Sequence, residues 1–291
     1  MIETIIITYY PNIEILNKTL NSLYSQVDKI YIVDNTPDKA ESLNKFQNGK
    51  IDIIYLMENK GIAYAQNIGI KKAIEDEADY IILSDQDTVY PENYVSEMLT
   101  CFNDEKVAAS GPLFVDSHTG KKQFFIVDGR FKFKKIYPTS GKHEVLQLIA
   151  SGTMIKTSAL KEIGLMREDL FIDWVDMEWC WRAGRKGYKI IGNADVSIYH
   201  GFGYDIKNLI IREITTRNHI RYYYMIRNAI YLSFRTEYIH CIQRFIMLSK
   251  TAMLIILYPL ISKPHWINLK YTLLGLCHGL TGKLGKLNEP H

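Results

Sequence analysis

The sequence predicts an α/β fold with a mostly parallel central sheet, followed by a helical C-terminal module. Short apolar, β-rich runs alternate with segments of helical period through the first half of the chain, an order typical of parallel sheets. A polar residue closely follows most of these runs, as in sheets that bind a ligand at their strand ends. With 291 residues, the chain can form one large domain and a smaller module.

The order of elements defines the first domain, which we expect over residues 1–204. The strand candidates are residues 2–8, 29–34, 51–57, 80–84 and 107–111. Helical periodicity occupies the intervals near residues 13–25, 62–78 and 92–103. Residues 113–146 are richer in Lys, Gly and aromatic side chains, and we interpret them as an inserted lid or acceptor-side segment before the apolar run 146–155.

The second part, residues 205–291, is predicted to be a helical module. It holds twelve Lys/Arg against four Asp/Glu, so it carries a charge of about +8 while the first 200 residues carry about −5. Its longest apolar run, residues 251–262, lies between Lys250 and Lys263 and contains Pro259. That run is shorter than the roughly 18 residues of a spanning helix, so we expect membrane-surface or subunit contact rather than a crossing.

Two features indicate a cytoplasmic protein. The four cysteines are scattered without CxxC spacing, which disfavours a zinc site or a disulfide framework. The chain opens on a strand-like run and lacks the basic segment of a signal peptide there.

Asp85-Gln86-Asp87 is the strongest chemical signal, because two carboxylates at a strand end can hold Mg²⁺ or Mn²⁺. Such a cation neutralises charge on a leaving diphosphate. The alternative is an ordinary surface turn. His200, at the end of a later strand candidate, is a possible third ligand through a neutral ring nitrogen or a purely structural residue.

Other strand ends offer polar groups for a nucleotide. Asp34-Asn35 can accept hydrogen bonds from a ribose or a base, or close its strand as an Asx-turn. Residues 59–69 place amides and small side chains at a helix start, which favours an anion but also suits tight packing. Three carboxylates, Asp173, Asp176 and Glu178, lie at another helix start, where one can act as a general base or cap the helix.

Taken together, these motifs resemble the inverting family 2 glycosyltransferases of the GT-A fold, over residues 1–205. The closest resemblance is to bacterial rhamnosyltransferases of O-antigen and capsule synthesis. In that group a Thr-Tyr-x-Pro start, an Asp-Gln-Asp motif and a Phe-Ile-Asp-x-Val-Asp-x-Glu-Trp segment recur, and the last appears here as residues 171–179.

The resemblance implies a role for each matching residue. Asp176 is the implied catalytic base, with Glu178 and Asp173 as reserves because many family members carry Glu-Asp where this chain has Val175-Asp176. The implied metal ligands are Asp87, Asp85 and His200. The implied donor contacts are Thr8, Tyr10, Asp34, Asn59, Gly61, Asn67, Asp85 and Gln86, and the acceptor-side group adds Trp179, Ser151 and Gly152.

The same resemblance implies the substrates. The favoured donor is dTDP-β-L-rhamnose, and a UDP-hexose or UDP-galactofuranose is the alternative. A polyprenyl-diphosphate-linked glycan is the implied acceptor, which fits a basic, Tyr-rich module at the inner face of the cell membrane. A solvated basic face or a homo-oligomer contact explains that module equally simply.

Other classes of protein explain less of the sequence. A nucleic-acid-binding protein accounts for the basic module but not for the acidic strand ends, so no nucleic-acid partner is expected. A non-catalytic nucleotide-binding protein remains an alternative that Asp176→Asn would distinguish. A nucleotidyltransferase would need a Gly-rich phosphate loop near the N-terminus, and residues 8–20 contain none.

Overall fold

The computed structural model describes residues 1–116, 120, 122–129, 133–200, 205–209, 212–216 and 218–288. The chain divides into two compact units. Unit 1 comprises Met1–Glu168 and Asp176–Gly201, and unit 2 comprises Asp169–Val175 and Phe202–His291. The sequence suggested one boundary between residues 204 and 205, whereas the short segment Asp169–Val175 groups with the C-terminal unit.

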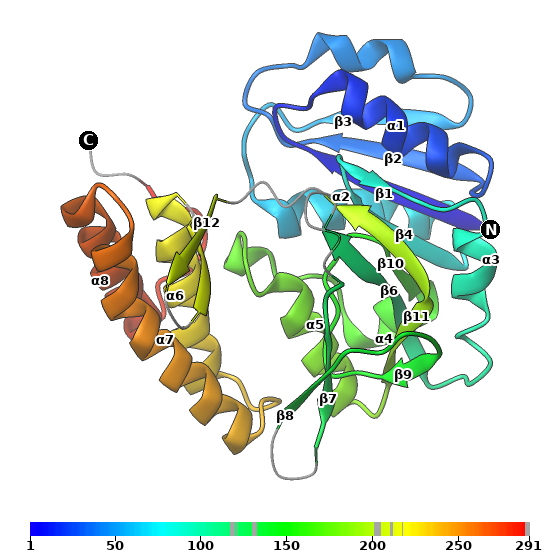
Figure 1. The fold of residues 1–291 in the computed structure, drawn as a ribbon. Coiled ribbons are helices and arrows are strands. Elements are labelled where there is room, and N and C mark those ends of the chain that lie inside the picture. Colours follow the sequence, from blue (N-terminus) through cyan, green and yellow to red (C-terminus); the bar gives the residue numbers. More distant parts are fainter. Residues whose placement is uncertain are drawn as a thin grey trace. The chain divides into compact units, whose positions relative to one another are not determined.

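Unit 1 is built on a nine-stranded sheet in the order β3-β2-β1-β4-β10-β6-β11-β5, with β9 pairing to β11 (Figure 1). The strands are β1 (Ile2–Thr8), β2 (Lys29–Asp34), β3 (Ile51–Tyr55), β4 (Tyr80–Asp85), β5 (Thr88–Val89), β6 (Val107–Asp116), β9 (Lys142–Glu144), β10 (Thr153–Lys156) and β11 (Lys189–His200). Neighbouring pairs among β1 to β4 are parallel, as are β6 and β11. The predicted mostly parallel sheet is confirmed.

Strand β10 is an exception in the mostly parallel sheet. It comprises Thr153–Lys156 and so begins inside the apolar run 146–155. It is antiparallel to both β4 and β6. A strand buried on both faces is apolar whichever way it runs, so the pattern does not reveal direction. Within the predicted insertion, β7 (Phe125–Asp128) and β8 (Phe133–Ile136) form a separate two-stranded sheet.

The helices of unit 1 are α1 (Ile13–Tyr24), α2 (Ile62–Glu75), α3 (Tyr94–Leu99), α4 (Thr157–Ile163) and α5 (Val175–Arg185), with 3-10 turns η1 (Glu41–Phe46) and η2 (Glu168–Leu170). Helices α1, α2 and α3 lie in the predicted helical intervals, α5 begins at the predicted helix start, and α4 was not predicted. The Asn12 side chain accepts from two amides at the start of α1, which offsets the unpaired donors there. Helix α2 approaches β1 so closely that a Cβ on Gly69 would lie 2.4 Å from Ile5 Cγ2.

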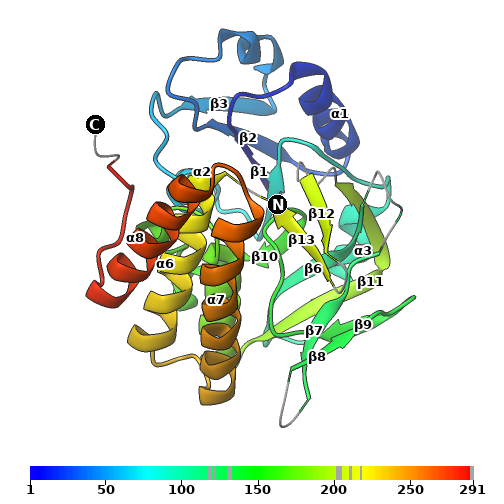
Figure 2. The same cartoon turned by 60° about the vertical axis from the view of Figure 1, so that its left-hand side comes forward.

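Unit 2 contains three helices, α6 (His219–Arg235), α7 (Cys241–Ile261) and α8 (His265–Thr281), which lie side by side (Figure 2). A helical start near residue 205 was expected, and this detail was wrong. An antiparallel pair, β12 (Asp205–Leu209) and β13 (Arg212–Thr216), comes first, and β13 contains β-branched residues that favour strands. Helix α7 is also longer than the predicted apolar run, because residues 241–250 continue the same helix.

Candidate active site

Pairing in the parallel sheet brings the predicted polar residues to one edge. Thr8 at the end of β1 pairs with Asp34 at the end of β2, and Ile7 pairs with Asp85 at the end of β4. The Asn35 side chain then reaches across to Asn59, with 3.1 Å between Nδ2 and Oδ1. The expected convergence of several strand ends therefore occurs in this structure.

Asp34 occupies the centre of this edge and is fully buried. Its Oδ1 accepts hydrogen bonds from the hydroxyls of Thr8 and Thr36, both at 2.8 Å. Its Oδ2 is also buried and has no hydrogen-bond partner within the described part of the chain. A buried carboxylate oxygen costs free energy unless it accepts a hydrogen bond, so Oδ2 is suited to a ligand N–H or O–H.

The loop into α2 is held by amide side chains. Asn35 Oδ1 accepts from the Lys60 amide at 2.8 Å, and Asn59 Oδ1 accepts from the Gly61 amide at 3.1 Å. Gly61 has a φ of 88° and caps α2 without a side chain, a conformation that glycine adopts readily. Asn59 and Gly61 thus shape the loop beside Asp34.

The segment after β1 presents an exposed aromatic residue at the same edge. The Tyr10 amide donates to Thr36 Oγ1 at 3.0 Å, and its φ is 45°. Because the backbone amide is anchored while the residue is 60 % exposed, the Tyr10 ring is available to a planar ligand.

The Asp85-Gln86-Asp87 turn is supported from below by hydroxyl groups. Ser151 Oγ accepts from the Asp85 amide at 3.2 Å and lies 2.7 Å from Thr88 Oγ1. Gln86 Oε1 accepts from the Tyr9 amide at 2.9 Å, which ties this turn to the end of β1. These bonds fix the backbone of the turn, while the side chains of Asp85 and Asp87 remain half-buried.

A buried tyrosine lies beneath the two aspartates. Tyr90 donates its hydroxyl hydrogen to Ser84 Oγ at 2.7 Å. Burial raises the pKa of Tyr90 well above its ordinary value, and the negative charges of Asp85 and Asp87 act in the same direction. The hydroxyl therefore stays protonated and adds no negative charge beside these carboxylates.

The half-buried carboxylates of Asp85 and Asp87 fit a hard divalent cation by the chemistry of their oxygen donors. Among the residues whose side chains are described, no group of three His, Cys, Asp or Glu side chains can hold a metal ion. Two carboxylates would therefore rely on ligand oxygens to complete the coordination sphere. The predicted third ligand, His200, ends β11, and its side chain lies outside the described residues.

Asp176, the second residue of α5, is connected to the Asp85-Gln86-Asp87 turn through the neighbouring residues Ala150 and Ser151. Its Oδ2 accepts from the Ala150 amide at 3.0 Å, and its Oδ1 accepts from the Met177 amide at 2.9 Å. Ala150 is followed by Ser151, the residue that holds Asp85. The dipeptide 150–151 therefore contacts both predicted catalytic groups, and sequence reasoning had placed Ser151 only among acceptor-side residues.

Gly152 continues this connection. Its amide donates to Leu83 of β4 at 2.7 Å, its φ is 73°, and a Cβ would lie 2.8 Å from Ile198 Cδ1. Both the backbone conformation and the limited space require glycine. Gly152 thus supports the site through the backbone, although its predicted position was beside the acceptor.

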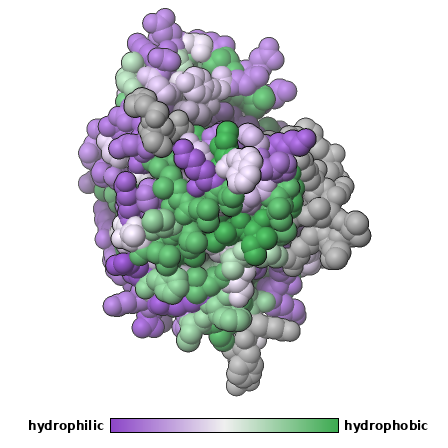
Figure 3. Space-filling view, turned by 90° about the vertical axis from the view of Figure 1, so that its left-hand side faces the viewer, coloured by the Kyte–Doolittle hydropathy of each residue, from purple (hydrophilic) through white to green (hydrophobic). Residues whose placement is uncertain are grey.

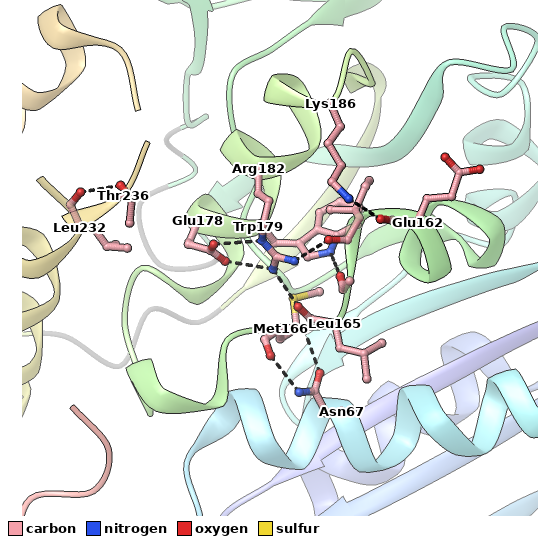
Figure 4. A network of polar contacts seen from close by, with 12 residues as sticks. Asn67, Glu162, Leu165, Met166, Glu178, Trp179, Arg182, Lys186, Leu232 and Thr236 are labelled. Carbon is pink, nitrogen blue, oxygen red and sulfur yellow. Dashed lines mark hydrogen bonds and ion pairs between the residues drawn. The ribbon is translucent and has the colours of Figure 1, made fainter. Parts of the chain in front are cut away.

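Three predicted site residues instead form a support network in unit 1 (Figure 4). Glu178 is fully buried and accepts from Arg182 Nε at 3.0 Å and Nη2 at 3.1 Å. Trp179 Nε1 donates to the Gly164 carbonyl at 2.8 Å. A buried carboxylate held by a guanidinium is poorly placed to take a substrate proton, so these contacts disfavour Glu178 as the reserve base.

Asn67 belongs to the same network. Its Nδ2 donates to the Met166 carbonyl at 2.9 Å and to Glu168 Oε1 at 2.8 Å, while its Oδ1 accepts from the Met166 amide at 3.0 Å. The whole amide is thus engaged with the segment 166–168. Asn67 thus braces α2 against that segment, and its contact with the donor stays a prediction.

The segment before Asp176 is described within unit 2, where α6 holds it. Asn228 Nδ2 donates to the carbonyls of Leu170, Ile172 and Asp173 at 2.9, 2.9 and 3.1 Å. Asp173 pairs with Arg221 Nη2 at 2.8 Å, which disfavours it as a base. Sequence reasoning missed Asn228, and the only signal was a polar pair, Arg227-Asn228, in an apolar helix.

Strain in this segment accompanies these bonds. Phe171, Asp173 and Trp174 have φ values of 65°, 61° and 69°, which cost free energy for residues other than glycine. Phe171 stacks on Tyr224 with ring centroids 4.8 Å apart, and Trp174 Nε1 donates to the Met225 carbonyl at 3.0 Å. The contacts with α6 therefore hold a conformation that the chain would not adopt alone.

The mostly parallel sheet, with polar residues at converging strand ends and two carboxylates at the end of β4, has the arrangement of the GT-A glycosyltransferase class. Two solved structures share this fold. GalNAc-T7, crystallised with UDP, GalNAc and Mn²⁺, aligns with a TM-score of 0.58 at 12% identity over 87% of this chain and 54% of that chain. S. aureus TarS 1-349 aligns with a TM-score of 0.58 at 16% identity over 96% and 80%.

The chain belongs to glycosyltransferase family 2. The family model "Glycosyl transferase family 2" matches residues 4–164. The dTDP-rhamnosyl transferase RfbF of Shigella flexneri is 31% identical over 236 residues, which cover 79% of each chain. A hyaluronan synthase of Streptococcus pyogenes is 32% identical over 126 residues, covering 38% of this chain and 29% of its own. The predicted family and enzyme class are confirmed.

Proposed function

We propose that this glycosyltransferase moves L-rhamnose from dTDP-β-L-rhamnose, with inversion, to a hydroxyl of a lipid-linked glycan in surface polysaccharide synthesis. The observation that carries the proposal is Asp34 Oδ2, a buried acceptor beside the strand ends. Similarity to the dTDP-rhamnosyl transferase RfbF over 79% of the chain supports the choice of donor. A UDP-hexose or UDP-galactofuranose donor is the second candidate, because related enzymes that use these donors share most of the same motifs.

The residues of the β1–β2 edge would bind the nucleoside. Asp34 Oδ2 would accept the hydrogen of the thymine N3–H, while Thr8 and Thr36 keep Oδ1 engaged. The exposed ring of Tyr10 would stack on the base. The loop shaped by Asn59 and Gly61 would border the ribose and diphosphate.

Asp87 and Asp85 would hold Mg²⁺ or Mn²⁺ against the diphosphate, with Gln86 and Ser151 fixing the turn. His200 stays a predicted further ligand. The cation would neutralise the charge on the departing dTDP.

Asp176 would act as the general base. Its carboxylate takes the proton of the acceptor hydroxyl as the hydroxyl oxygen forms a bond to the anomeric carbon. The bond from that carbon to the diphosphate oxygen breaks on the opposite face, and its electron pair leaves with dTDP. The β-linked donor thus gives an α-L-rhamnosyl product.

Charge and location support the choice of acceptor. A polyprenyl-diphosphate-linked glycan is anionic and lies at the cytoplasmic face of the cell membrane, where the basic C-terminal unit would be attracted. We therefore propose a peripheral enzyme on the cytoplasmic face of the cell membrane. Whether it also forms a homo-oligomer is a separate question.

The test is a donor panel. Binding and slow hydrolysis of dTDP- and UDP-sugars are measured with Mn²⁺, with Mg²⁺ and with chelator, for wild type, Asp87→Ala and Asp104→Ala. We expect selectivity for dTDP-rhamnose and about a hundredfold loss of hydrolysis in Asp87→Ala. Asp104 is exposed and pairs with Lys189 near the starts of β6 and β11, so its replacement should change nothing.

Selectivity for a UDP-sugar would leave the proposed enzyme class unchanged and show that the donor is a UDP-sugar instead of dTDP-rhamnose. Failure to bind any sugar nucleotide would overturn the proposal.

A further inference from the structure

The outward sides of α7 and α8 form an apolar face, which we call the α7–α8 face. On α7 the exposed positions 242, 245, 249, 253, 256 and 260 recur every three or four residues, all apolar except Ser249, and Phe245 is 72 % exposed. On α8 the most exposed is Trp266, at 82 %. Figure 3 shows apolar side chains gathered continuously on this side. The large apolar members are Ile242, Phe245, Met253, Ile256, Leu260, Trp266, Ile267, Leu273 and Leu280.

The opposite sides of the same helices account for packing within unit 2. Tyr258 of α7 stacks on Tyr222 of α6 with ring centroids 3.9 Å apart. Gly275 of α8 lies so close to α6 that a Cβ would be 2.6 Å from the Tyr223 carbonyl oxygen. The α7–α8 face is therefore additional to the apolar surface that the helices need to pack together, and exposed apolar patches of this kind mark binding surfaces.

The charge around the face indicates its partner. Residues 238–288 contain six Lys/Arg and no Asp or Glu. Lys250, Lys263 and Lys270 are exposed along α7, the following turn and α8. A second copy docked through the same face would bring lysines toward lysines, whereas an anionic lipid surface offers the opposite charge together with an apolar layer.

The packing of α7 favours a helix lying in the membrane plane. In the described part of the chain, α7 is the one helix long and apolar enough to cross a membrane, with 21 residues. One side of it is packed within unit 2, however, and includes the buried polar residues Gln243 and Thr251. A helix with one apolar side exposed and the other packed on protein suits the interface.

We propose that the α7–α8 face docks in the plane of an anionic lipid surface, with Phe245 and Trp266 inserted below the headgroups. This deepens the proposed function by assigning the surface that would bring the enzyme to a lipid-linked acceptor. The docking itself requires neither donor nor acceptor.

The test uses the full chain and vesicles of phosphatidylcholine, with or without phosphatidylglycerol, in flotation and tryptophan fluorescence assays. We expect binding to the anionic vesicles with a blue shift in emission that is lost in Trp266→Phe. The double variant Phe245→Asp/Ile256→Asp should bind at least about tenfold more weakly. Ile15→Asp, at an exposed apolar position of α1, is the matched control and should bind like wild type.

Charge is tested separately. Lys250→Gln, Lys263→Gln and Lys270→Gln should each weaken binding to anionic vesicles by about fivefold. Thermal unfolding of every variant confirms that it is folded. Absence of wild-type binding, or equal binding by Phe245→Asp/Ile256→Asp, would overturn the inference.

A concentration-dependent dimer that this double variant abolishes, without vesicle binding by wild type, would assign the face to a second copy instead. Donor binding is measured in the same preparations without vesicles. If wild type does not bind the donor, the proposed function is contradicted, while the docking inference is unaffected.

Discussion

At the scale of single residues, the site depends on which polar atoms the fold leaves available. Thr8, Asp34 and Asp85 were predictable because each follows an apolar strand in a parallel sheet. Asn67 was not, because its partners come from a distant part of the chain. Asn67 contacts Met166 across 99 positions of sequence, and no local pattern encodes such a contact.

Asp34→Asn should weaken donor binding while preserving the fold. The amide oxygen can still accept from Thr8 and Thr36, but an NH₂ group then replaces Oδ2 and faces the thymine N3–H donor. We expect donor affinity to fall about tenfold to a hundredfold, measured by calorimetry. Asp52→Asn, near the start of β3, is the control, and equal affinity in all three proteins would remove Asp34 from the donor site.

At the scale of elements, the position of the segment before Asp176 depends on α6. The sequence predicted helices in this region but not which residues of α6 would bind backbone carbonyls. Three positive φ values before α5 show a conformation that local propensity does not favour. Similarly, the apolar pattern of β10 did not reveal that it runs antiparallel between β4 and β6.

Asn228→Ala should therefore destabilise unit 2 and lower turnover. The substitution leaves the carbonyls of Leu170, Ile172 and Asp173 without the Asn228 donor, at a cost of roughly 3 kcal/mol in the free energy of unfolding. Ser233→Ala on the same helix is the control, because the buried Ser233 hydroxyl has no hydrogen-bond partner among the described residues. Urea unfolding of both variants checks this. Similarly small decreases in the free energy of unfolding would show that the Asn228 hydrogen bonds do not stabilise this segment.

At the scale of the whole molecule, stability should depend on pH through Glu3, a fully buried residue of β1. Burial, with the charge of Asp76 as the next cause, raises the pKa of Glu3 to about 7. The folded protein thus binds this proton more tightly than the unfolded chain does, whose glutamate pKa is about 4.3. The contribution of Glu3 to the free energy of unfolding is therefore fully present at low pH and is lost as the pH rises toward 7.

Glu3→Gln should remove that dependence. Between pH 5 and 8 we expect the free energy of unfolding of wild type to fall by up to about 3 kcal/mol relative to Glu3→Gln. Urea unfolding at both pH values measures the difference. Glu14→Gln, at an exposed position of α1, should follow wild type, and parallel behaviour of all three proteins would show that Glu3 is charged in the fold.

The whole reaction is tested most directly by comparing donor binding and turnover in Asp176→Asn. With dTDP-rhamnose, a metal ion and a membrane acceptor fraction, we predict a loss of turnover of at least about a hundredfold with donor affinity unchanged. Asp173→Asn, whose carboxylate pairs with Arg221, should retain far more turnover. Full turnover by Asp176→Asn would contradict the assignment of Asp176 as the base and, with it, the account of this site as that of an inverting transferase.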